Sequence, residues 1–188
     1  MKKLLIFVVM CIALCSTYNL KAVTMKTNHK NQIVIDCLIT NVRDKKILIQ
    51  QRSGTRKLFP YCWDFIGGHL ENNESVETCI KRELLEEANM HLVRIITQVH
   101  EFYWSYDDTN VVDKVYMIIA RGDFRLEEGK AIAARWITRN EAPLLLKPGE
   151  TTNGMYQAAL NAFDILEGKT NLNAHQTDLW EYCKKSEG

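Results

Sequence analysis

The chain has 188 residues, of which 46% are hydrophobic and 25% are charged, and its formal net charge at pH 7 is +1. This composition is sufficient for one sizeable core, and the length fits a single catalytic domain. The small net charge argues against a protein that binds nucleic acid through bulk electrostatic attraction.

Residues 1–22 have the pattern of a secretory signal peptide. Lys2 and Lys3 precede an apolar run from Leu4 to Leu14, and polar residues follow. The run is too short to span a bilayer comfortably, so no stable membrane span is expected after processing. We therefore expect export, to the periplasm or out of the cell. The alternative is that Met25 is the true start and that the protein is cytoplasmic.

Two apolar segments, residues 32–40 and 46–51, predict neighbouring β-strands joined by a turn. Arg52 stands directly after the second of them and opens a basic loop. A further strand is predicted at residues 62–66, immediately before two consecutive glycines. The first part of the chain is therefore expected to supply strands of one sheet.

A helix is predicted over residues 76–88, because Ser75 is a suitable N-cap and nothing in the segment breaks a helix. Glu83, Glu86 and Glu87 are three or four positions apart, so they project from one side of this helix. Carboxylates at this spacing repel one another, and an oxygen-only cluster of this kind suits a hard divalent cation. The usual alternative for an acidic run is a solvated helix face.

The stretch from Gly68 to Met90 resembles the signature box of the Nudix hydrolases, a family that cleaves nucleoside diphosphates linked to another group. The matching residues, at the spacing of that box, are Gly68, Glu74, Arg82, Glu83, Glu86 and Glu87. So many specified residues in one register argue against a merely solvated face. The chain departs from the box at Asn89, where the family has Gly. Asn is the next residue to tolerate a left-handed helix end, so we interpret Asn89 as a functional substitution.

The resemblance implies a metal site on the helix. Glu83, Glu86 and Glu87 would hold Mg²⁺, with Mn²⁺ as the alternative, together with a backbone carbonyl of Gly67. The absence of a Cβ at Gly67 and Gly68 would let the backbone approach a metal ion or a substrate phosphate closely.

The resemblance also implies supporting and substrate-binding roles. Arg82 would pair with Glu74 and orient Glu83. Arg52 would face a substrate phosphate, with a solvated surface arginine as the alternative. Glu128, in a loop before a predicted strand, is a candidate for an additional metal ligand or general base, with a solvated loop residue as the alternative.

Three more strands are predicted, at residues 91–106, 114–121 and 131–137. Thr138 and Glu141 form a capping-box pattern for a short helix, and residues 153–167 form an amphipathic helix. This order resembles the Nudix fold, an α/β/α sandwich with a mixed sheet, over residues 31–168. Residues 169–188 form a C-terminal tail to which the sequence assigns no role.

Several aromatic residues and cysteines have two interpretations. Phe102, Tyr103, Trp104 and Tyr106 could stack on a nucleobase, but we favour the core, where strand aromatics more often lie. Cys37 and Cys79 are predicted to pack in the core, and Cys62 and Cys183 could pair in an exported protein. No cysteine spacing matches a zinc site, and no histidine is assigned as a ligand.

These features together predict a Mg²⁺-dependent hydrolase that cleaves a diphosphate linkage in a nucleoside diphosphate derivative. The general base is a helix carboxylate or Glu128. The partner is a small-molecule nucleotide and not a nucleic acid; the sequence defines neither the derivative nor the oligomeric state. Two alternatives stay open. One is a non-catalytic nucleotide-binding module of the same fold, and the other is a diphosphate isomerase, which needs a reactive Cys and Glu.

Overall fold

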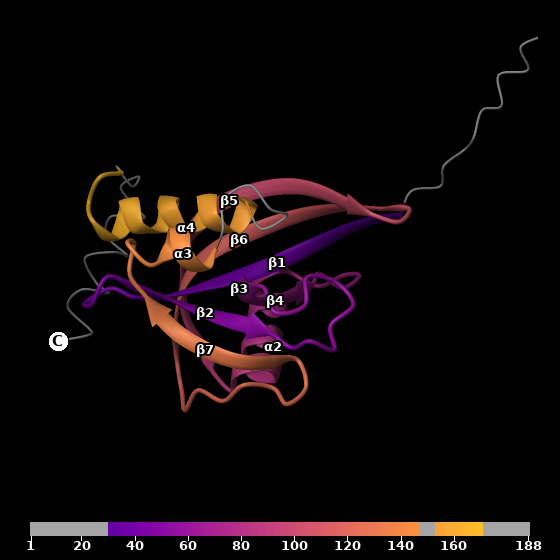
Figure 1. Ribbon diagram of the computed structural model, residues 1–188, viewed down its shortest axis with the longest axis horizontal. Helices are drawn as coiled ribbons and strands as arrows, with labels where there is room; N and C mark the ends of the chain where they lie inside the picture. The colour runs from indigo at the N-terminus through magenta and orange to yellow at the C-terminus, as the bar shows by residue number, and fades with distance from the viewer. Residues whose placement is uncertain (1–29, 147–152, 171–188) are drawn as a thin grey trace, which may run out of the picture.

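The computed structural model describes residues 30–146 and 153–170 (Figure 1). The candidate signal peptide at residues 1–22, Met25 and Cys183 lie outside the described residues, as does most of the C-terminal tail. Within the described ranges, no helix has the length and apolar character needed to cross a membrane.

A seven-stranded mixed sheet forms the centre of the described part of the chain. Its strands are β1 (Lys30–Asn41), β2 (Lys46–Arg52), β3 (Trp63–Asp64), β4 (Ile66–His69), β5 (His91–Tyr106), β6 (Thr109–Arg121) and β7 (Ala131–Ile137). β1 pairs in parallel with β6 and antiparallel with β2 and β4. β5 pairs antiparallel with β6, whereas β3 and β7 both pair with β2. β1 is thus the strand that joins the parts of the sheet.

Helices cover both faces of this sheet, as expected for an α/β/α sandwich (Figure 1). α2 (Val76–Ala88) packs against β1, β4 and β5 on one face. α3 (Ala142–Leu145) and α4 (Asn153–Leu166) pack against each other on the opposite side, where α4 contacts β5 and β6.

The alternation of side chains along β1 divides the core into two clusters. Ile35, Cys37 and Ile39 point toward α2, where Cys79 also packs, and Leu38 points toward α4. Both cysteines are buried, which confirms that they are core residues.

The order of elements follows the sequence prediction, with differences at their ends. β6 begins at Thr109, earlier than predicted. The turn between β5 and β6 consists of only two residues, Asp107 and Asp108, and Asp107 adopts the left-handed conformation that such a tight turn needs. The strand predicted at residues 62–66 is divided into β3 and β4. Thr138 does not begin α3: Glu141 is the residue before that helix, and its carboxylate accepts from the Thr138 N–H and hydroxyl.

α2 has the bounds that its capping signals predict. The Ser75 hydroxyl accepts a hydrogen bond from the Thr78 N–H at 3.1 Å. Asn89 ends the helix with φ 53° and ψ 37°, and its side chain donates to the Asp123 carbonyl at 3.0 Å. The asparagine therefore adopts the left-handed conformation for which the family uses glycine.

We expect Asn89→Ala to lower the free energy of unfolding by about 1–2 kcal/mol, because alanine bears the steric cost of the left-handed conformation. Asn89→Gly should stay within about 0.5 kcal/mol of the wild type, since it removes the Cβ but also the bond to Asp123. Urea unfolding measures both variants. An Asn89→Ala protein as stable as the wild type would show that this helix end does not depend on residue type.

Candidate active site

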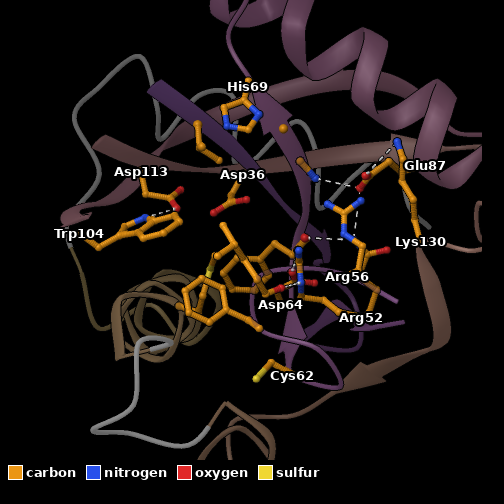
Figure 2. A pocket seen from close by; sticks show the side chains of 18 of the residues that line it. Asp36, Arg52, Arg56, Cys62, Asp64, His69, Glu87, Trp104, Asp113 and Lys130 are labelled. Carbon is orange, nitrogen blue, oxygen red and sulfur yellow. Dashed lines mark hydrogen bonds and ion pairs between the residues drawn. The ribbon is translucent and has the colours of Figure 1, made fainter. Parts of the chain in front are cut away.

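A cavity of about 170 Å³ opens where β1, β2, β4, β5 and β6 meet the C-terminal half of α2 (Figure 2). Its charged lining residues are Asp36, Arg52, Arg56, Asp64, Glu87, Asp113 and Lys130. Gly67 and Gly68 form part of the wall, and aromatic rings form another part. The cavity thus joins part of the signature box to side chains from distant strands.

The three carboxylates on α2 have different surroundings. Glu83 and Glu87 are each only 5% exposed, whereas the side chain of Glu86 is 52% exposed. Of the three, only Glu86 is therefore open to solvent. The buried pair lies under the backbone of Gly67 and Gly68, which shields it from solvent.

Arg82 connects three segments through its guanidinium group. Nε and one terminal nitrogen donate to the two carboxylate oxygens of Glu74, both at 3.0 Å, and the other terminal nitrogen donates to Glu83 at 2.5 Å. The first of these terminal nitrogens also donates to the His69 carbonyl at 3.1 Å. The bonds from Arg82 lower the pKa of Glu74 to about 2. This is the arrangement that the resemblance implies for Arg82.

The two glycines leave room for the buried carboxylates. A Cβ on Gly68 would lie 2.2 Å from a Glu83 carboxylate oxygen, so this carboxylate would have to move, and a Cβ on Gly67 would lie 2.3 Å from the Ile35 carbonyl oxygen. The Gly67 N–H donates to Glu87 at 3.3 Å, and the Gln50 side chain donates to the same oxygen at 3.2 Å. Glycine is therefore required here by close approach and not by an unusual φ angle.

These residues fit a divalent cation in their chemistry. Burial raises the pKa of Glu83 above its ordinary value; Arg82 opposes this, and the charges of Glu87 and Glu86 raise the pKa further. A bound cation would relieve that repulsion, and the ligand atoms are all oxygen. Over residues 30–146 and 153–170, no three His, Cys, Asp or Glu side chains meet in the arrangement of a metal site.

Glu128 is exposed, and its side chain is not part of the cavity lining. The preceding Glu127 donates its N–H to the Glu87 carbonyl, and its side chain lies 2.7 Å from the Lys130 amine. That amine is 3.7 Å from Glu87, so Lys130 is the residue through which this loop reaches the site.

Arg52 lies in the cavity wall. Its Nε donates to the Leu58 carbonyl at 3.1 Å, and a terminal nitrogen donates to Asp64 at 2.8 Å. Burial raises the pKa of Asp64 to about 7, although the charge of Arg52 lowers it. Arg56 lines the same cavity, which brings two guanidinium groups to it.

Other cavity residues were missed by sequence reasoning. Asp36 and Asp113 are single carboxylates within apolar strand segments, and this isolation is the signal that could have revealed them. Trp104 and Tyr106 line the cavity and do not fill the core, whereas Tyr103 is 72% exposed. Phe102 both lines the cavity and packs against the core, so the core prediction was correct only for this ring and only in part.

Comparisons with known proteins identify the family. A model of the NUDIX domain matches residues 30–158, more than half of the chain. This protein therefore belongs to the Nudix family.

Individual relatives are more distant. The chain is 32% identical over 107 residues to an uncharacterized Nudix hydrolase of Nostoc sp. strain PCC 7120, a match that covers 56% of this chain and 63% of that protein. It is 23% identical over 148 residues to the NAD-capped RNA hydrolase NudC of Mycobacterium tuberculosis. That match covers 79% of this chain and 44% of NudC. The chain thus spans less than two thirds of the length of either relative.

Solved structures share the fold. The E. coli ORF135 protein superposes with a TM-score of 0.60 at 23% identity, over 78% of this chain and 97% of that one. Together with the family match, this similarity confirms the α/β/α architecture expected from the order of elements.

We expect the contribution of Glu74 to stability to disappear in acid. Its ordinary pKa is 4.5 and the folded value is about 2, so the contribution is complete above 4.5 and is lost as the pH falls toward 2. Urea unfolding should show that the wild type has a larger free energy of unfolding than Glu74→Gln at neutral pH, and that this difference becomes smaller at about pH 3. Glu77→Gln, on the exposed side of α2, is the control. A difference in the free energy of unfolding that is the same at both pH values would contradict the pairing with Arg82.

Proposed function

We propose that this protein is a hydrolase that uses Mg²⁺ to cleave a diphosphate linkage in a nucleoside diphosphate derivative. The observation that carries the proposal is the position of the buried carboxylates Glu83 and Glu87 beside the Gly67–Gly68 backbone, at one end of a cavity lined by arginines and aromatic rings. Membership of the Nudix family supports it.

Glu83, Glu86, Glu87 and the Gly67 carbonyl would hold the cation, either Mg²⁺ or Mn²⁺. When bound, the cation would polarise phosphoryl oxygens and lower the pKa of a water molecule. The chain itself holds the ligands in position: Arg82 restrains Glu83, and the Gly67 N–H and Gln50 restrain Glu87. Such outer contacts orient metal ligands and raise the affinity for the metal.

The basic residues of the cavity would bind the substrate phosphates. Arg52 has five N–H donors in a planar fork that suits phosphate oxygens, and its bond to Asp64 fixes its direction. Arg56 and Lys130 add positive charge to the same wall. These groups would orient the diphosphate and offset its negative charge.

A helix carboxylate would accept the proton of the attacking water. Glu86 is the most exposed of the three, so its carboxylate oxygens are accessible to water without any rearrangement. Glu128, the other candidate for this role, does not line the cavity, although the neighbouring Glu127 N–H donates to the Glu87 carbonyl.

The competing functions make different demands on the chain. A non-catalytic module usually loses carboxylates of the signature box, and all of them are present here. An isomerase needs a reactive thiol, but burial raises the pKa of Cys79 to about 12, which keeps it protonated at neutral pH. Cys62 lines the cavity, so the analysis of reaction products with an isoprenoid diphosphate tests the isomerase directly.

A hydrolysis panel of nucleoside triphosphates, dinucleotides, nucleotide sugars and NAD-capped RNA, with Mg²⁺ present, tests the proposal. We expect small-molecule nucleotides to be cleaved, and expect Glu86→Gln and Glu87→Gln each to lower kcat by about 10²-fold or more while the circular dichroism spectrum is kept. Glu77→Gln, on the same helix and paired with Lys81, is the matched control. Full activity in either test variant, or in the presence of a chelator, would refute the mechanism.

We also propose that the protein acts outside the cytoplasm, because the Lys2–Lys3 pair and the apolar run after it match a secretory signal. N-terminal sequencing of the protein from its own cells should find a mature chain that starts near residue 22. A native chain that begins at Met25 and is found in the cytoplasm would refute export.

A further inference from the structure

Three aspartates are buried around the cavity, and the proposed chemistry uses only Asp64, which orients Arg52. Asp36, Asp64 and Asp113 are 4%, 8% and 3% exposed. Each has one buried carboxyl oxygen without a hydrogen-bond donor: Oδ2 of Asp36, Oδ1 of Asp64 and Oδ1 of Asp113. Buried acceptors without donors are costly in a folded protein, so a ligand that supplies donors would be favoured here.

Asp36 and Asp113 act as a pair because of the sheet. β1 and β6 run parallel, with Val34 opposite Asp113 and Asp36 opposite Val115, so both aspartates point to the same side. Their carboxyl groups face each other across the cavity floor (Figure 2). A proton shared by the two would supply one hydrogen bond, whereas each carboxyl oxygen can accept two. The pair therefore keeps acceptor capacity directed into the cavity in either protonation state.

Aromatic rings stand beside this pair. Trp104 donates its indole N–H to Asp113 Oδ2 at 3.3 Å, which fixes the ring next to the carboxyl group. Tyr106 stacks on Trp104 at a centroid distance of 5.4 Å, and Phe59 meets the same indole edge to face, also at 5.4 Å. The site therefore combines aromatic rings, against which the face of a planar ligand could pack, with carboxyl oxygens that could accept hydrogen bonds from the ligand's edge.

The size of the cavity agrees with a heterocycle. Its volume is about 170 Å³, and an apolar protein cavity of about 150 Å³ holds a benzene ring. Gly67, Gly68 and Glu87, where we place the diphosphate, line the same cavity, and Gly67 lies directly beside Asp36, its partner in the β1–β4 pairing. A nucleotide could therefore extend from the aspartate pair to the signature box.

We propose that Asp113 and Asp36 recognise a nucleobase that carries two adjacent N–H donors, as the ring N–H and exocyclic amino group of guanine do, with its ring against Trp104. Adenine offers a single donor group flanked by ring acceptors, which would face the carboxyl oxygens unfavourably. The proposal names the base of the substrate and in that respect rests on the proposed function.

Binding of GMP and IMP to the full chain tests this directly, by calorimetry with chelator present so that hydrolysis plays no part. IMP differs from GMP only by the missing exocyclic amino group. We expect the wild type to bind GMP about tenfold more tightly than IMP, since one hydrogen bond to a buried acceptor is lost. AMP should bind no better than IMP. IMP or AMP binding as tightly as GMP, or no binding of GMP, would overturn the proposal without any variant.

Asp113→Asn supplies a second measurement. It should reduce the preference for GMP over IMP to about twofold while leaving the affinity for IMP nearly unchanged. Glu101→Gln makes the same chemical change on β5 outside the cavity and should keep the preference. If Asp113→Asn lowered the affinities for GMP and IMP equally, the role of Asp113 would be merely structural.

The two proposals can fail separately. A protein that prefers GMP to IMP but cleaves no nucleotide would overturn hydrolysis and keep the base site. A protein that cleaves nucleotides with no preference for the amino group would overturn the base site alone.

Discussion

The guanidinium group of Arg82 is the interaction on which the arrangement of the site depends. It binds Glu74 in the loop before α2, the His69 carbonyl at the end of β4 and Glu83 on the helix. A lysine has one nitrogen and could not meet three segments in this geometry. Because the loop and helix are joined here, the Gly67–Gly68 backbone stays close to the helix carboxylates.

Because these carboxylates are buried close together, their charged forms are energetically unfavourable. Glu83 and Glu87 are buried near each other, and Asp36, Asp64 and Asp113 are buried around the same cavity. Burial of acids without enough partners disfavours their charged forms, and the pKa of both Asp36 and Asp113 is raised mainly for this reason. A fold that keeps such groups is arranged for ligands that bring positive charge or N–H donors. A divalent cation at the helix carboxylates and a donor-rich base at the aspartate pair would satisfy both requirements.

The best-predicted part of the molecule is the part governed by local signals. α2 runs from Val76 to Ala88 as its caps indicate, because the Ser75 hydroxyl and the Asn89 backbone N–H each bond to residues only a few positions away in the chain. The strand β5 was also predicted with its observed bounds, since a long alternating segment carries its own signal. Predictions were poorer where neighbouring strands decide the outcome: β3 and β4 separate at Phe65, and β6 starts earlier than its apolar core suggests.

The sequence by itself determined the family, the box helix and the carboxylates that this helix presents, because fixed spacing on a helix sets direction. Only the tertiary structure decided which strand residues reach the cavity. Asp36 and Asp113 are far apart in the chain and meet because β1 pairs in parallel with β6. A two-residue period indicates that a side chain alternates between faces, but not whether the face it reaches is core or cavity. For the same reason Trp104 was assigned to the core, and the exposure of Glu128 was decided by the path of its loop.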